Sequence, residues 1–125
     1  MSIATYQIST KTLILSENGK ILGSWHAVSG GAKNTKPLPI GIYTKITDPI
    51  GGIRKDQPKG YNDPKGNAFF LRVENNATMG RGFAIHPDGP KLGVTHGCIG
   101  ITRNALSFYQ LAWKKTKLTR LIVKY

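Results

Sequence analysis

The sequence predicts a single, mainly β (α+β) domain, and three observations support this class. The 125 residues include 15 glycines and 7 prolines, which indicates many turns rather than a bundle of long helices. Short apolar runs of strand length follow one another between turn signals. Only one segment, near the C-terminus, has apolar residues at helical spacing. The length fits one domain, residues 1–125, with room for a modest core.

The N-terminal half is predicted to consist of strands joined by tight turns. Asn18-Gly19 is a strong hairpin signal between two strand-like runs. The strand after this turn ends at Ser29-Gly30-Gly31, and a proline-rich stretch breaks regular structure before the next strand. The expected strands are residues 3–8, 12–16, 20–28 and 42–47.

Residues 48–67 are predicted to form a long surface loop, because glycines and prolines are mixed there with many charges. A loop of this length is either a lid over a site or an insertion without fixed structure. Strands are expected at 68–73 and at 83–86, separated by a glycine-bearing turn. The second of these strands delivers His86 at its end.

One clear helix is expected directly after the only cysteine. Thr102 is a suitable N-cap, and the following apolar residues favour a helix of roughly three turns that ends near residue 115. The residues that recur at helical spacing are Leu106, Tyr109 and Trp113. Their aromatic side chains are expected in the core. Residues 118–123 are predicted to close the domain as a final strand.

The charge balance restricts the partners of the domain. Lys and Arg number 18 and Asp and Glu 6, a net charge of +12. Such a field favours polyanions: nucleic acid, anionic lipid headgroups, or a cell wall whose peptides carry carboxylates. A solvated, solubilising surface is the alternative, and charge alone does not choose between them.

The N-terminal residues predict synthesis in the cytoplasm without a signal peptide. Residues 1–7 have no basic region followed by a long apolar run. No stretch approaches the ~18 consecutive apolar residues of a membrane helix, so stable membrane insertion is not expected. One cysteine excludes an internal disulfide.

The sequence around Cys98 carries the strongest chemical signal. This cysteine ends the segment Thr95-His96-Gly97-Cys98, twelve residues after His86. A thiol is a poor nucleophile until its pKa is lowered or its proton is removed, and imidazole is the usual agent. Gly97 allows a sharp turn and a close approach of the backbone to a substrate. The pattern therefore predicts an enzyme with a cysteine nucleophile.

The residues allow several assignments of roles within this site. His86 either takes the thiol proton during attack or rests as imidazolium beside a thiolate. Backbone amides at Gly97 or Cys98 are candidate donors to an oxyanion, and either Asp88 or a backbone carbonyl orients His86. His96 either donates a hydrogen bond to the tetrahedral intermediate, tunes the thiol, or is a buried structural histidine.

Two other kinds of protein compete with the cysteine enzyme. A zinc hydrolase would use His86, His96 and Cys98, with His26 as a fourth ligand; the ligand spacing is unusual and no acidic base is evident. We therefore expect no metal or other cofactor, and a structural role for His26. A basic, non-enzymatic domain that binds nucleic acid or the cell wall is the second alternative. Its stacking residues would be exposed aromatic side chains: Trp25, Tyr43, Tyr61 and Phe69.

The segments His86-Pro87-Asp88-Gly89 and 95–101 resemble the motif of the L,D-transpeptidase (YkuD-type) catalytic domain, as do residues 28–31 and 36–43. The resemblance covers most of the chain and implies compact sheets arranged as a β-sandwich or barrel. It implies Cys98 as the acylated nucleophile and His86 as the general base. It further implies an oxyanion site at His96 and Gly97, substrate contact at Thr95, and orientation of His86 by the Pro87 carbonyl.

Two departures from the family pattern stand near the motif. The interval from His86 to Thr95 is shorter than is usual, and Gly100 replaces the usual Arg or Asn. Arg103, expected one helical turn further on, is a candidate to bind a substrate carboxylate instead.

The resemblance also implies a reaction and a setting. The acyl donor would be a peptidoglycan stem tetrapeptide, and the acceptor an amine of another stem (transpeptidation), a D-amino acid (exchange) or water (L,D-carboxypeptidase). A minimal domain of this kind is similar to small antibacterial effectors delivered by type VI secretion. That likeness implies non-classical secretion, action in the periplasm or cell wall, secretion machinery and a cognate immunity protein as partners, and no nucleic acid. A phage-encoded wall enzyme is the alternative.

Overall fold

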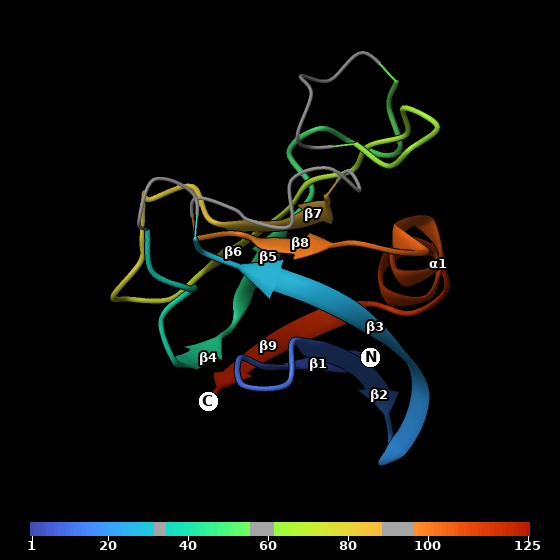
Figure 1. The fold of residues 1–125 in the computed structure, drawn as a ribbon. Helices are drawn as coiled ribbons and strands as arrows, with labels where there is room; N and C mark the ends of the chain where they lie inside the picture. Colours follow the sequence, from blue (N-terminus) through green and yellow to red (C-terminus); the bar gives the residue numbers. More distant parts are fainter. Residues whose placement is uncertain (32–34, 56–61, 89–96) are drawn as a thin grey trace.

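A computed structural model describes residues 1–31, 35–55, 62–88 and 97–125, and it confirms the mainly β class. The described residues form nine strands in the order β4-β9-β1-β2-β3-β8-β7-β6-β5 and a single short helical segment (Figure 1). The two ends of this order are consecutive in the chain, because only Thr44 separates β4 from β5. The sheet therefore curls into a nearly closed barrel.

The first half of the barrel is a meander to which the C-terminal strand is added. β1 pairs antiparallel with β2, and β2 with β3, whereas β9 runs parallel to β1 and antiparallel to β4. Asn18 and Gly19, with φ of 53° and 77°, form the expected hairpin turn. The strands are β1 (Ser2–Gln7), β2 (Thr12–Glu17), β3 (Lys20–Ser29), β4 (Gly41–Tyr43) and β9 (Leu118–Lys124).

The second half contains the strands that carry the chemical motif. β3 continues into it and pairs antiparallel with β8, which runs parallel to β7. β7 and β5 lie antiparallel on either side of β6. The strands are β5 (Lys45–Thr47), β6 (Leu71–Glu74), β7 (Ala84–Pro87) and β8 (Ile99–Ile101).

Aromatic side chains join the helical segment to the barrel. Trp25 meets Phe108 edge-on with ring centroids 5.1 Å apart, and Phe69 lies 4.9 Å from Tyr109. Both contacts lie in the hydrophobic core, where these rings bury large apolar areas. Tyr43 is also fully buried. The nucleic-acid alternative predicted that Trp25, Tyr43 and Phe69 are exposed, and this prediction was wrong. Tyr61 lies outside the described residues.

Several predicted boundaries differ from the structure. The strand expected at 42–47 is split into β4 and β5, where the chain passes from one end of the sheet to the other. The strand expected at 68–73 is β6, Leu71–Glu74, while Ala68 forms isolated bridges with Arg54 and Asn62. Arg54 and Asn62 of the predicted loop 48–67 are thus paired with Ala68, three residues before β6.

The helical segment also begins later than predicted. The short strand β8 lies between Cys98 and the helix, and α1 spans Ala105–Tyr109 before continuing as a π-helical turn, η2 (Gln110–Lys115). Its N-cap is Asn104, so the prediction of Thr102 was wrong. The Thr102 hydroxyl instead donates to the carbonyl of His26 at 3.2 Å, because it sits beside β3. No helix in the described ranges is long and apolar enough to cross a membrane.

Candidate active site

The parallel pair β7–β8 positions the predicted nucleophile and base. His86 stands opposite Gly100 in this ladder, and Cys98 directly precedes β8 at the level of Ala84. The backbone of Ala84 hydrogen-bonds the thiol, so Cys98 lies next to this residue of the neighbouring chain segment. Continued by one residue, the register therefore puts Cys98 two positions from His86 along the paired chains.

The tautomer of His86 follows from its contact with Pro87. The imidazole is buried, and Nδ1 lies 2.6 Å from the Pro87 carbonyl oxygen. A carbonyl oxygen only accepts hydrogen bonds, so Nδ1 carries a proton and the imidazole lone pair is on Nε2. Of the two orienting groups left open by the sequence, the backbone carbonyl makes the contact. The Phe70 ring is stacked on the imidazole, with centroids 6.2 Å apart.

Burial shifts the pKa values of both groups toward their neutral forms. Desolvation lowers the pKa of His86, against the smaller opposing effect of the Pro87 carbonyl. Desolvation raises the pKa of Cys98, and the hydrogen bond from Ala84 opposes it. A neutral thiol beside a neutral imidazole is therefore the favoured resting state. In this state the imidazole is suited to serve as a general base rather than as the partner of a preformed thiolate.

Gly97 has a conformation and a contact that only glycine suits. Its φ is +112°, and a Cβ built there would lie 2.7 Å from Cε1 of Phe83. The Phe83 ring is itself covered by the Arg81 guanidinium, 4.9 Å from the ring centroid. A side chain at the residue before the thiol would therefore have to displace the Phe83 ring.

Ser29 fixes the other side of the Gly97 turn, and sequence reasoning did not single it out as a site residue. Its hydroxyl donates to the Gly97 carbonyl at 3.1 Å and accepts from the Leu38 amide at 2.8 Å. The adjacent Gly30 lets the chain return closely, because a Cβ there would lie 2.5 Å from Pro37 N. The only sequence signal was the place of Ser29 at the end of a strand, before two glycines.

The other predicted site residues lie at different places relative to the β7–β8 pair. His96 and Thr95 lie outside the described residues, so their roles stay predictions. Arg103 is exposed in the link between β8 and α1; no helical turn separates it from Gly100, because residues 99–101 are a strand. His26 is exposed on β3, with Nδ1 2.8 Å from the Thr102 hydroxyl, which agrees with a structural role. In the described ranges no three His, Cys, Asp or Glu side chains gather as a metal site.

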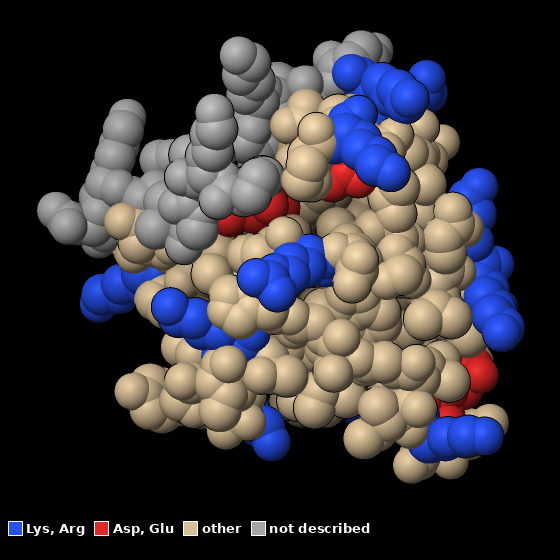
Figure 2. Space-filling view, turned by 45° about the vertical axis from the view of Figure 1, so that its right-hand side comes forward, with Lys and Arg blue, Asp and Glu red and all other residues tan. Residues whose placement is uncertain are grey.

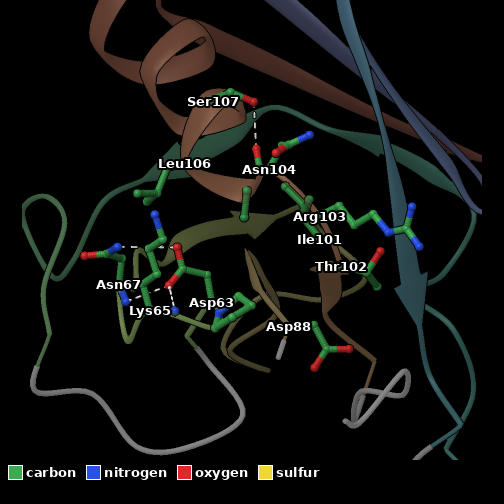
Figure 3. A pocket seen from close by; sticks show the side chains of 12 residues that line it. Asp63, Lys65, Asn67, Asp88, Ile101, Thr102, Arg103, Asn104, Leu106 and Ser107 are labelled. Carbon is green, nitrogen blue, oxygen red and sulfur yellow. Dashed lines mark hydrogen bonds between the residues drawn. The ribbon is translucent and has the colours of Figure 1, made fainter. Parts of the chain in front are cut away.

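A cavity of about 640 Å³ lies beyond the C-terminal ends of β7 and β8 (Figure 3). Asp88 and Arg103 line it, whereas Cys98 and His86 do not. The Asp88 side chain is 1% exposed, and neither carboxylate oxygen has a hydrogen-bond partner within the described structure. Burial raises the pKa of Asp88 to about 6.

Because burial raises the pKa of Asp88, we predict that the domain loses stability as the pH rises from the pKa of an unfolded Asp to the pKa of Asp88 in the folded state. The folded state holds a proton up to about pH 6, whereas an unfolded Asp releases it near pH 3.9. The free energy of unfolding should therefore fall by about 2 kcal/mol or more between about pH 4 and pH 7. Asp88→Asn should remove this decline, as measured by urea denaturation across that range. An unchanged slope in the variant would contradict the assignment.

The fold and the site define a β-barrel domain with a histidine on β7 and a cysteine directly before the parallel strand β8. A family model described as the L,D-transpeptidase catalytic domain (YkuD) matches residues 3–120. The chain belongs to this family. A search of curated proteins gave no match.

Solved structures of similar fold carry the same family name. An L,D-transpeptidase from Mycobacterium smegmatis is 23% identical with a TM-score of 0.63, and one from Mycobacterium tuberculosis H37Rv is 19% identical with a TM-score of 0.68. The alignments cover 99% of this chain and 58% and 57% of those chains. A third, solved in complex with imipenem, is 22% identical with a TM-score of 0.65, over 98% of this chain and 58% of its own. This chain thus spans a little under three fifths of their length.

Proposed function

We propose that this domain catalyses cysteine-dependent acyl transfer on peptidoglycan stem peptides, as an L,D-transpeptidase. Exchange of a D-amino acid or L,D-carboxypeptidase activity would follow when a free D-amino acid or water is the acceptor. The observation that carries the proposal is the β7–β8 ladder. In a chain of this family, its register puts Cys98 two residues from His86 along the paired strands, and the lone pair of His86 is on Nε2.

In the first half-reaction, Nε2 of His86 takes the thiol proton while Sγ of Cys98 attacks the peptide carbonyl carbon. Backbone amides at Gly97 and Cys98 donate to the oxyanion that develops. As the C–N bond breaks, the imidazolium returns its proton to the leaving amine. The product is a thioester on Cys98 and a released terminal amino acid.

In the second half-reaction, an amine or water attacks the thioester carbon. His86, neutral again, accepts the proton of the attacking group. The C–S bond breaks, and the sulfur of Cys98 takes the proton back from the imidazolium. The Pro87 carbonyl supports both halves, because it keeps the same imidazole nitrogen facing the reaction throughout.

The charge of the surface suits a substrate rich in carboxylates. Lys and Arg side chains are spread over the face shown in Figure 2, with few acidic side chains between them. The net charge of +12 gives a long-range attraction rather than a specific contact. Its reach falls with salt, since the Debye length is ~8 Å at physiological ionic strength.

The experiment is to incubate the protein with a muropeptide tetrapeptide and to record its intact mass. We expect an acyl adduct on Cys98 and release of D-Ala in the wild type, and neither with Cys98→Ala. His26→Ala, an exposed histidine outside the ladder, is the matched control and should react like wild type. Equal processing by wild type and Cys98→Ala would overturn the proposal. Product masses distinguish crosslinking, exchange and hydrolysis.

We also propose the cell wall as the place of action and an antibacterial effector role, with an immunity protein and secretion machinery as partners. The support for this role is the sequence resemblance to small secreted effectors. Growth of a bacterium that exports the domain to its periplasm, compared with one that exports Cys98→Ala, tests it. Equal growth of the two strains would refute the effector role and leave the proposed chemistry unaffected.

A further inference from the structure

The turn between β6 and β7 lies at the same end of the sheet as the proposed nucleophile. β7 and β8 run parallel, so the segments that lead into them, residues 75–83 and Gly97-Cys98, lie at one end of this strand pair (Figure 1). Phe83 joins the two segments, because a Cβ built at Gly97 would lie 2.7 Å from its Cε1 atom. The turn is therefore a neighbour of any peptide held at Cys98.

Hydrogen bonds fix the backbone of this turn around Arg81. The Thr78 N–H donates to the side-chain oxygen of Asn75 at 3.0 Å, and the Arg81 N–H donates to the Thr78 carbonyl at 3.0 Å. The Gly80 N–H donates to the Glu74 carboxylate at 3.1 Å. The turn thus presents one long cationic side chain from a backbone of defined shape.

The Arg81 guanidinium has no carboxylate partner in the described part of the chain. It belongs to an exposed side chain and lies 4.9 Å from the centroid of the Phe83 ring. None of the ion pairs among the described residues includes Arg81. Glu74, at the start of the turn, already faces Arg72 at 3.3 Å and Lys45 at 4.0 Å. A guanidinium above an aromatic face still has its in-plane N–H donors for a carboxylate.

The other arginine considered for this role stands at the far end of the strand pair. Arg103 lines the cavity beyond the C-terminal ends of β7 and β8, whereas Cys98 directly precedes β8. Arg81 precedes β7 and therefore lies at the end where the thiol is. The Phe83 ring separates its guanidinium from the Gly97 backbone, and a residue or two of extended peptide, at up to about 3.6 Å each, would span this gap.

We propose that Arg81 binds a carboxylate of the stem peptide and selects peptides that carry this group near the bond to be cut. The N–H groups of a guanidinium match the two oxygens of a carboxylate, which favours Arg over Lys in such a contact. A tetrapeptide offers its C-terminal carboxylate and, where its diamino acid is also a dicarboxylic acid, a side-chain carboxylate. The role of that peptide as acyl donor rests on the proposed function.

The binding test uses Cys98→Ala, which cannot be acylated, and three tetrapeptides: one with both carboxylates free, one amidated at the C-terminus, and one amidated at the side-chain carboxylate. Dissociation constants are measured with and without the additional change Arg81→Gln. We expect Arg81→Gln to weaken binding of the free acid about tenfold or more, the usual loss for a charge-assisted hydrogen bond. One amidated peptide should bind both proteins alike, which identifies the carboxylate that Arg81 holds.

The comparison of peptides separates binding from packing. If Arg81 only supported the Phe83 ring, its loss would weaken all three peptides by the same factor, and this result would overturn the proposal. Equal affinity for the free acid with and without Arg81, or no binding by Cys98→Ala, would overturn it as well. Arg120→Gln is the matched control, because it removes one positive charge from the net +12 at an exposed position of β9 and should leave all three affinities unchanged.

Acylation of the wild type by the free tetrapeptide, read by intact mass, tests the proposed function separately. Acylation combined with no effect of Arg81→Gln on affinity would leave the reaction standing and refute the carboxylate contact. Carboxylate-dependent binding through Arg81 without acylation would support the contact and refute the proposed reaction.

Discussion

His86→Ala is expected to slow acylation of Cys98 by about 100- to 10,000-fold, the usual contribution of a general base. The loss should be large because burial raises the pKa of the thiol, so that little thiolate exists without the imidazole. The wild type should keep its rate below pH 6.5, since burial lowers the pKa of His86 and keeps the base neutral there. Initial rates of adduct formation, measured by mass from pH 5 to 10, provide the test.

The pH profile of the variant distinguishes loss of a base from loss of packing. Without His86 the residual rate follows the thiolate, so it should rise about tenfold per pH unit toward the raised pKa of Cys98. A merely structural defect would lower the rate by the same factor at every pH. His26→Ala, which removes an exposed imidazole, should leave the wild-type profile unchanged. A flat profile in His86→Ala would contradict general-base catalysis.

Local sequence signals predicted those parts of the fold that depend on neighbours in the chain. Asn18-Gly19 forms its hairpin because both residues accept positive φ, whatever surrounds them. Thr102 failed as an N-cap because its hydroxyl is used by His26 across the sheet, a contact between distant segments. The sequence analysis did not predict β8, because Ile99-Gly100-Ile101 is a three-residue strand that is fully buried. Such a strand lacks the alternation of apolar and polar residues that marks a half-exposed strand.

In the site, too, the sequence predicted residues by their chemical type but not the contacts that depend on the fold. Cys98 and His86 could be predicted as nucleophile and base because a thiol and an imidazole are the residue types that this chemistry uses. The choice of the Pro87 carbonyl over Asp88 required the side-chain orientation, since both lie within two residues of His86. The contact between Ser29 and Gly97 joins residues 68 positions apart, and no local pattern encodes it.

Gly97→Ala is expected to destabilise the domain by about 2–5 kcal/mol. An alanine at φ +112° costs about 1–2 kcal/mol, and forcing its Cβ against Phe83 adds about 1–3 kcal/mol. Ser29 prevents the turn from rotating away, because it holds the Gly97 carbonyl. The displaced turn also carries Gly97 and Cys98, whose amides are the proposed oxyanion donors, so activity should fall even where the variant remains folded. Urea denaturation and the Cys98 acylation rate measure the two effects.

Two further variants separate backbone strain from the contact with Phe83. Gly52 has φ +124° with no atom within 4 Å of a built Cβ, so Gly52→Ala should show the backbone cost alone. Phe83→Leu should recover part of the loss in Gly97→Ala, because the smaller side chain no longer meets the new methyl group, and a double-mutant cycle gives that part. Equal destabilisation by Gly97→Ala and Gly52→Ala, with no coupling to Phe83, would show that the aromatic wedge does not restrict this turn. Coupling with Phe83 would instead mean that residue 97 is fixed by side-chain packing as well as by its backbone angle.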